Sequence, residues 1–261
     1  MTHLLESMSP DARLLAAMTA IVFVAALASS VAGFAFSALA GPPLVWLLGD
    51  PVGALGVLTL CSVALQSYSV WWLRRRIEWR ALAPFFAAGT ASVPIGVALL
   101  TRLPPHAVAL GLGAFLVAYA GYLFCRSEPP IVRADWRADA LVGALGGLAG
   151  GLAALPGLLV TLWCGVRGWS KERQRAIYQP FILAMQLETF AWLGCQAPAS
   201  VPGACAVVLV PAALAATGLG LHVFRRLSGR QFGLAVNGLL LVSGVALLAR
   251  HLYSGLRFVQ S

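Results

Sequence analysis

Polar side chains able to bind an anion recur inside the apolar runs of this sequence. Gln66 and Gln186 lie at matched positions in two such runs, and Gln179 precedes Gln186 by about two helical turns. A glutamine amide offers two N–H donors without a charge, which suits reversible binding of an anion. The alternative is an interhelical hydrogen bond that only holds helices together. Ser37 and Ser62 are further candidates, although a serine in a membrane helix can also bond its own backbone.

Glycine and proline interrupt two of the apolar runs and form a second group of candidates. They are Gly33, Gly41 and Pro42 in the first run, and Gly150, Gly151, Pro156 and Gly157 in the second. Proline removes a helix hydrogen bond and clashes with the preceding turn, so we expect these runs to break into half-helices. The N-terminus of a half-helix carries free N–H groups and a partial positive charge, which can hold an anion inside the membrane. The alternative is that small residues only permit close helix packing, as Gly147-x-x-x-Gly151 would.

Glu188 is the only acidic residue deep in an apolar run. An ionised carboxylate at the centre of a bilayer costs about 2.5–3.5 kcal/mol on insertion scales, which favours its protonated form. Glu188 is therefore a candidate for proton coupling. The alternative is an acid wetted at the membrane interface, since Gly194, near the end of the run, lies only six residues away.

The sequence has no motif for covalent catalysis, nucleotide binding or metal binding. It has no His-x-x-x-His pair, no nucleophile elbow and no P-loop lysine. Its five cysteines include no Cys-x-x-Cys pair, and most lie in or beside apolar runs, where a cysteine behaves as a small hydrophobe. We expect no enzyme activity, cofactor or metal site, so transport energy would come from a gradient or a partner.

Elements that cross a membrane must position these residues. Of 261 residues, 60% are hydrophobic and only 10% are charged, whereas a soluble domain carries about 25% charged residues. The apolar runs are about 20 residues long and do not alternate, which predicts membrane helices. We expect an all-α bundle of about eight segments, at residues 14–48, 52–73, 82–100, 106–124, 140–164, 177–194, 201–224 and 232–252.

The eight segments divide into two sets of four. We expect a first transmembrane repeat over residues 1–124, a polar linker over 125–139 and a second repeat over 140–261. Each repeat opens with a segment broken by Gly and Pro, as in duplicated transporters. The loop after the second segment is basic, whereas its counterpart after the sixth has no charge. Positive loops favour the cytoplasm, so parallel and inverted repeats both stay open, and a re-entrant glycine-rich segment would resolve the conflict.

The formal net charge is +9, and almost all basic residues lie in short loops between apolar runs. We interpret these residues as charges that set the topology beside anionic lipid. No basic stripe with interleaved aromatic residues predicts nucleic-acid binding. The expected partners are membrane lipid and a small anion, and a homodimer is left open.

A set of short motifs recurs in order along the chain. They are Gly33-x-x-x-Ser37, Gly41-Pro42-Pro43-Leu44, residues 47–51, Arg74 to Trp79, Leu103-Pro104-Pro105, Gly143 through Pro156, Gly168-Trp169-Ser170-Lys171 and Gln179-Pro180. In this order the sequence, from about residue 25 to 248, resembles the sulfite exporter TauE/SafE family. The resemblance implies export of sulfite, sulfoacetate or other organosulfonates across the bacterial inner membrane. We expect a multi-pass secondary transporter coupled to an ion gradient. An anion channel and a membrane-embedded enzyme are the alternatives.

Overall fold

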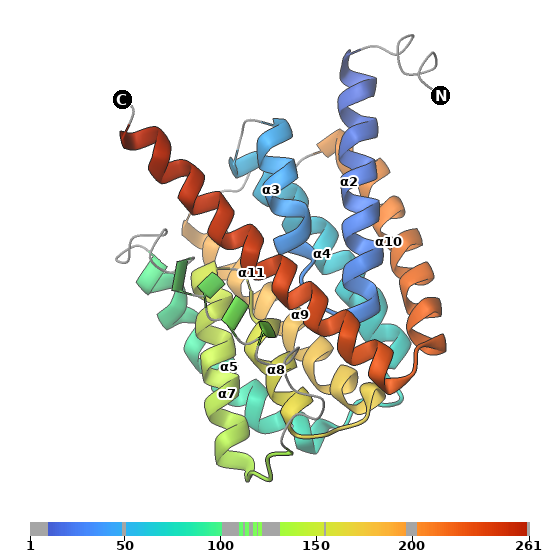
Figure 1. Cartoon of the computed structure of the whole chain (residues 1–261), viewed down its shortest axis with the longest axis vertical. Coiled ribbons are helices and arrows are strands. Elements are labelled where there is room, and N and C mark those ends of the chain that lie inside the picture. Colours follow the sequence, from blue (N-terminus) through green and yellow to red (C-terminus); the bar gives the residue numbers. More distant parts are fainter. Residues whose placement is uncertain are drawn as a thin grey trace.

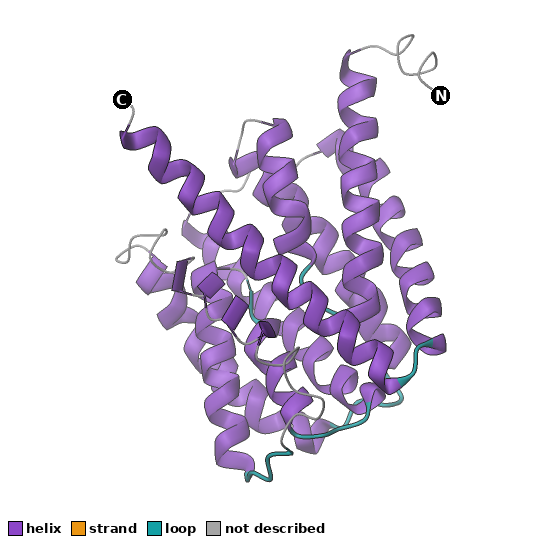
Figure 2. Cartoon of the chain, in the orientation of Figure 1, coloured by secondary structure: helices purple, strands orange, loops and turns teal. Residues whose placement is uncertain are grey.

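The computed structural model describes residues 10–48, 51–100, 110–111, 113–114, 117–118, 120–121, 131–153, 155–196 and 203–259. The regular elements in these ranges are all helices, as Figure 2 shows. In chain order they are α2 (Pro10–Ala32), α3 (Phe36–Leu48), α4 (Pro51–Leu73), α5 (Trp79–Leu100), α7 (Trp136–Ala153), α8 (Gly157–Val166), α9 (Lys171–Gln196), α10 (Gly203–Arg226) and α11 (Gly229–Val259). The all-helical prediction is therefore confirmed for the described part of the chain.

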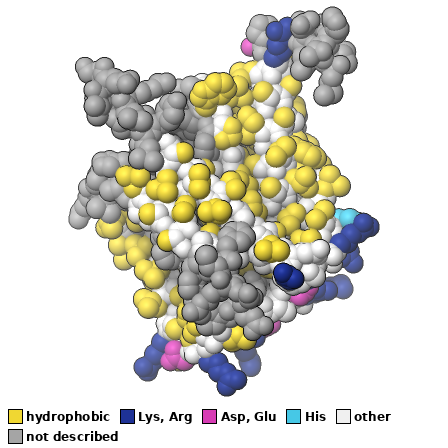
Figure 3. Space-filling model, viewed as in Figure 1, with side chains coloured by type: hydrophobic (Ala, Val, Ile, Leu, Met, Phe, Trp, Pro, Cys, Tyr) yellow, Lys and Arg dark blue, Asp and Glu magenta, His cyan; other side chains and the backbone are white. Residues whose placement is uncertain are grey.

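Apolar side chains cover the outside of the bundle as well as its core. Trp46 is 85% exposed and Leu141 62% exposed, and the described surface in Figure 3 is largely hydrophobic between its two ends. Within the described residues, three helical stretches are long and apolar enough to cross a membrane, namely Asp11–Ala32, Trp79–Leu99 and Val208–Arg226. The predicted segment at residues 106–124 lies largely outside the described residues.

The first apolar run forms two helices, α2 and α3, which pack against each other as a hairpin (Figure 1). The chain leaves helical geometry at Gly33, with φ 89°, and Ala35, with φ 73°. A residue in this left-handed region ends an α-helix directly. The interruption therefore falls at residues 33–35, whereas Gly41, Pro42 and Pro43 lie inside α3.

The second broken run also forms a hairpin, made of α7 and α8. The interruption lies between Ala153 and Gly157 and contains Pro156. The open end of this hairpin is closed by two bonds: Val132 N–H donates to the Val166 carbonyl over 2.8 Å, and Arg167 Nη1 donates to the Ala134 carbonyl over 2.6 Å. The start of α7 and the end of α8 therefore lie at the same end of the bundle.

Basic side chains gather at that end, which we call the basic end (Figure 3). Arg173 of α9 pairs with Glu78, just before α5, at 3.0 Å. Lys171 donates to the carbonyl of Phe224 near the end of α10, over 3.2 Å. These contacts bring the ends of α4 and α10 to the starts of α5 and α9. Since α4 ends there and α9 begins there, these two packed helices are antiparallel.

Glycine allows α7 to approach α5 very closely. A Cβ on Gly143 would lie 2.5 Å from the Phe85 Cα, and one on Gly151 would lie 2.6 Å from the Val93 carbonyl oxygen. Gly147, between them on the same helical stripe, is equally enclosed by the backbone of Gly89. This is the small-residue packing that the Gly147-x-x-x-Gly151 motif predicts, and it holds the second hairpin firmly against α5.

Candidate functional site

The two interruptions border one small cavity, which we call the central cavity. It encloses about 20 Å³, room for about one water molecule. Its lining comes from both interruptions and from α4 and α9: Phe34, Ala35, Phe36, Ser37, Ser62, Gln66, Leu155, Pro156, Gly157, Leu158, Ile182 and Gln186. Six of the residues expected from the sequence are thus brought together, namely Ser37, Ser62, Gln66, Pro156, Gly157 and Gln186.

Two helices begin at this cavity. Phe36 and Ser37 are the first residues of α3, and Gly157 and Leu158 are the first of α8. The first turn of a helix has N–H groups without intrahelical partners and carries a partial positive charge. No side chain caps the N-terminus of α8. The described lining contains no charged side chain, so these helix ends dominate the local electrostatics and favour an anion.

The polar side chains of the cavity come from α4 and α9. Gln186 Nε2 donates to Ser62 Oγ over 2.8 Å, and the Ser62 hydroxyl lies 3.1 Å from Gln186 Oε1. Gln66 is 2% exposed, and its Oε1 has no hydrogen-bond partner within the described structure. Turning that amide by 180° would place its NH2 group at the same position. Gln66 can therefore present two donors to a bound anion, whereas Gln186 also joins the two helices.

Other predicted residues lie around the cavity rather than in its lining. Gln179 Nε2 donates to the Gly33 carbonyl over 3.4 Å, so it supports the first interruption. A Cβ on Gly150 would lie 3.0 Å from the Pro156 Cβ, which places Gly150 behind the second interruption. Gly151 faces the backbone of α5.

Two more predicted residues belong to α3, away from its first turn. Gly41 is buried, and a Cβ there would meet only Leu58 among the described atoms, at 3.6 Å. The side chain of Pro42 lies outside the described residues.

Glu188 lies on α9, partly buried, and does not line the central cavity. Its carboxylate accepts a side-chain hydrogen bond from Thr90 of α5. Glu188 is two residues beyond Gln186, so it lies farther from the basic end than the cavity does. Among the described residues, no group of three His, Cys, Asp or Glu side chains is placed to hold a metal ion.

Sequence reasoning missed two residues that hold the first interruption, Arg175 and Tyr178. Both are completely buried. Arg175 donates from Nη1 to the Val31 carbonyl over 3.3 Å and from Nη2 to the Ser30 carbonyl, and the Tyr178 hydroxyl donates to the Ala32 carbonyl. These carbonyls lie at the end of α2, where intrahelical partners run out. The signal in the sequence is one arginine a helical turn before Gln179. The predicted sixth segment begins at residue 177 and leaves this arginine among the loop charges, whereas α9 begins at Lys171 and includes it.

The fold and cavity define a helical membrane protein in which two broken segments meet at a site suited to an anion. The sequence matches the sulfite exporter TauE/SafE family over residues 18–247, nearly the whole chain. The chain therefore belongs to this family of membrane transporters. No curated protein and no solved structure matches it.

Proposed function

We propose that the protein is a secondary transporter that exports sulfite or a related small sulfur-containing anion across the bacterial inner membrane. The observation that carries the proposal is the meeting of the α3 and α8 N-termini at one central cavity. Membership of the sulfite exporter family supports the substrate class. The positive-inside rule supports a cytoplasmic position for the basic end, so export would run from that end to the opposite one.

The cavity's chemistry suits binding followed by release. The anion would accept hydrogen bonds from N–H groups at the starts of α3 and α8, from the Gln66 and Gln186 amides, and from the Ser37 and Ser62 hydroxyls. Helix ends and neutral donors stabilise a negative charge without forming a salt bridge. Transport requires binding strong enough for loading and weak enough for release. The cavity of about 20 Å³ is too small for a polyatomic anion, so transport requires it to widen.

The arrangement of the helices supports inverted repeats. The α7–α8 hairpin opens at the basic end, whereas α3 turns back along α2 towards the opposite end (Figure 1). The contact between α2 and α10 has a counterpart in the contact between α7 and α5, and α4 packs antiparallel to α9. Re-entrant hairpins from opposite sides would reconcile the loop charges with two repeats. In such a protein, relative movement of the repeats around a fixed midplane site gives alternating access.

Glu188 is the proposed proton-coupling group. It lies on the same helix as Gln186, and Thr90 hydrogen-bonds its carboxylate. Glu188→Gln keeps the shape and the hydrogen-bonding ability of the side chain but cannot ionise. We expect this variant to bind substrate nearly as the wild type does and to lose the dependence of transport on a pH gradient. Continued concentration of substrate in response to a pH gradient would mean that coupling lies elsewhere.

The substrate class is tested by transport into liposomes that contain the purified protein. Sulfite, sulfoacetate, taurine and sulfate would each be offered under a pH gradient, with protein-free liposomes as the control. The proposal predicts saturable, gradient-dependent flux of sulfite or of sulfoacetate. Flux that neither saturates nor follows the gradient would indicate an anion channel, and no flux of any of the four would overturn the substrate class.

A further inference from the structure

A second cavity lies at the basic end, and residues at the ends of α4 and α9 line it. This basic-end cavity encloses about 430 Å³ and is lined by Trp72, Arg76, Glu172, Phe224 and Arg225. Trp72 and Arg76 are at and just beyond the end of α4, and Glu172 is in the first turn of α9. Because α4 and α9 also line the central cavity, the interface between these two helices runs from one cavity to the other.

The register of α4 against α9 identifies the residues between the cavities. Ser62 lies opposite Gln186, as their hydrogen bond shows, and at the basic end Arg76 shares a cavity with Glu172. Moving one residue towards the C-terminus of α4 therefore corresponds to moving one residue towards the N-terminus of α9. At intermediate levels, Ser69 comes opposite Gln179, and Leu73 comes opposite Arg175.

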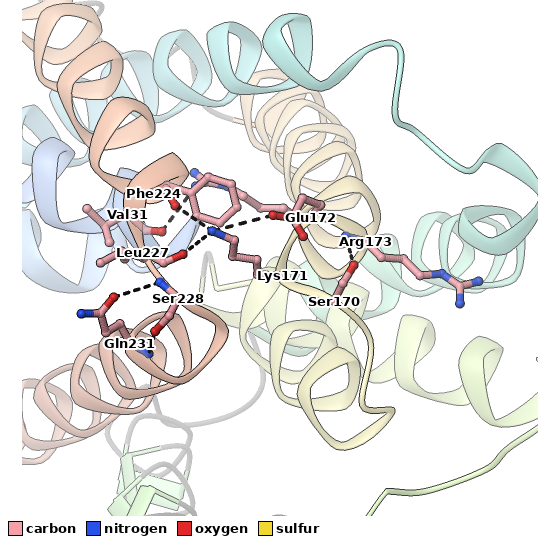
Figure 4. A network of polar contacts seen from close by, with 10 residues as sticks. Val31, Ser170, Lys171, Glu172, Arg173, Phe224, Leu227, Ser228 and Gln231 are labelled. Carbon is pink, nitrogen blue, oxygen red and sulfur yellow. Dashed lines mark hydrogen bonds and ion pairs between the residues drawn. The ribbon is translucent and has the colours of Figure 1, made fainter.

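Arg175 lies just outside the basic-end cavity and contacts one of the side chains that line it. Its guanidinium carbon is 4.2 Å from the centre of the Phe224 ring, and Phe224 lines that cavity. Lys171 holds the same part of α10, with its ammonium group bonded to the carbonyls of Phe224 and Leu227 (Figure 4). One aromatic ring therefore separates a completely buried arginine from a cavity that already contains two others.

Buried polar atoms without a hydrogen-bond partner are concentrated in the region between the two cavities. Seven buried side-chain N or O atoms in the described structure lack a hydrogen-bond partner, and five of them belong to residues between or beside the cavities: Ser30, Gln66, Ser69, Arg175 and Gln179. In a dry core, each such atom costs about 1–3 kcal/mol. Water along the α4–α9 interface would give all five atoms partners, and an anion there would accept hydrogen bonds from the Ser30 and Ser69 hydroxyls and from Arg175 Nε.

We propose that the anion travels between the basic-end cavity and the central cavity along α4 and α9, and that Arg175 binds it on the way. This inference rests on the proposed function. A guanidinium presents a planar array of donors that matches an oxyanion, and Nε of Arg175 is free to donate. Nη1 and Nη2 stay bonded to the end of α2, so an anion at Nε would be coupled to the interruption that borders the central cavity. On this route the Phe224 ring, which contacts the Arg175 guanidinium and lines the basic-end cavity, must move aside for the anion to reach Nε.

Cysteine accessibility tests the route without depending on sulfite. Ser69→Cys, at a position 1% exposed, would be made in full-length protein lacking the native cysteines, with Ser92→Cys between α5 and α7 as the buried control. Sealed vesicles of each orientation would be treated with membrane-impermeant thiosulfonate reagents, one anionic and one cationic. We expect Ser69→Cys to react from the basic end, about tenfold or more faster with the anionic reagent, and Ser92→Cys to stay unreactive.

Arg175 variants in the Ser69→Cys background separate anion binding from support of α2. Arg175→Gln should remove the preference for the anionic reagent, and Arg175→Lys should keep it. Arg80→Gln changes an exposed arginine at the same end and should also keep it. A structural role alone would leave the preference unchanged in every variant that folds.

Two results would overturn the inference: a Ser69→Cys variant that is unreactive from both sides, and equal rates with the two reagents. Both results are measured with Ser69→Cys alone, so they test the inference even if Arg175→Gln fails to fold. Sulfite flux with an unreactive Ser69→Cys would refute the route alone. A reactive, anion-selective Ser69→Cys without flux of any tested anion would refute the substrate class alone.

Discussion

The two interruptions place a helix N-terminus at the same cavity by different physical means. The first uses left-handed backbone at Gly33 and Ala35 and contains no proline. The second contains Pro156, which has ordinary helical angles of φ −64° and ψ −29°. One interruption therefore depends on backbone conformation and the other on a missing N–H group.

The supports of the two hairpins differ as well. Side chains of α9, namely Arg175, Tyr178 and Gln179, hold the carbonyls at the end of α2. The α7 helix is instead held by close backbone packing of its glycines against α5. Two hairpins with different sequences can therefore form equivalent parts of one site. This explains why the first run contains fewer glycines than the second.

The largest expected effect is at Gly33. Alanine there must adopt a left-handed φ, which costs about 1–2 kcal/mol, and its Cβ would lie 2.6 Å from Tyr178 Cε2, adding about 1–3 kcal/mol of overpacking. Gly157→Ala is the matched change in the second interruption, where the backbone is not left-handed and the new Cβ would lie 2.3 Å from Ile182 Cδ1, the far end of a flexible side chain. Thermal unfolding in detergent should show a much larger loss for Gly33→Ala. Equal losses would mean that the two interruptions are built alike.

A smaller loss is expected at the support of the second hairpin. Gly151→Ala would place a Cβ 2.6 Å from the Val93 carbonyl oxygen and 2.7 Å from the Val97 nitrogen, both backbone atoms of α5. Overpacking of this kind costs about 1–3 kcal/mol. Gly218→Ala is the control, since its Cβ would be 3.7 Å from the Tyr68 hydroxyl. The same unfolding measurement should separate the two variants, and a Gly151→Ala protein as stable as Gly218→Ala would exclude close packing as the support.

The smallest effect should have the opposite sign. Ala35 lies at φ 73°, a conformation that glycine adopts without the Cβ clash. Ala35→Gly should stabilise the protein by up to about 1 kcal/mol, the relief of the left-handed strain less the extra entropy of glycine in the unfolded chain. Thermal unfolding would check this, and a destabilised variant would show that the methyl group's contacts at the cavity outweigh the strain.

The sequence predicted the helical class and named half of the residues that line the central cavity, because both depend on local signals. Polar residues stand out in apolar runs, as Gln66, Gln186 and Ser62 do. Glycine and proline indicate a break in a helix whatever the tertiary structure around them. The position of the first break was harder to predict from the sequence, because the pair Pro42-Pro43 is a stronger local signal for a break than Gly33 is. The contacts of Gly33 with Tyr178 and Gln179 leave no room for a side chain, and such contacts between distant segments cannot be predicted from a local pattern.

The role of Arg175 could not be predicted from sequence for a related reason. An arginine near the start of a helix is usually a solvated loop charge, and only the fold brings it against the end of α2 and the ring of Phe224. The apolar lining of the cavity, such as Ile182 and Leu155, was equally hidden. Apolar residues are common throughout a membrane helix, so none of them is distinctive by type.

The most direct test of the central claim is the affinity of the purified protein for sulfite, measured by calorimetry for the wild type, Gln66→Ala and Gln174→Ala. Gln174 lies at the basic end and donates to the Trp169 carbonyl, so its variant controls for loss of a glutamine elsewhere. Loss of a hydrogen bond to a charged group weakens binding by about 1–2 kcal/mol, or roughly tenfold in Kd. We predict this loss for Gln66→Ala, with its folded yield unchanged, and no change in the affinity of Gln174→Ala. Wild-type affinity in Gln66→Ala would contradict the claim that the central cavity binds the anion.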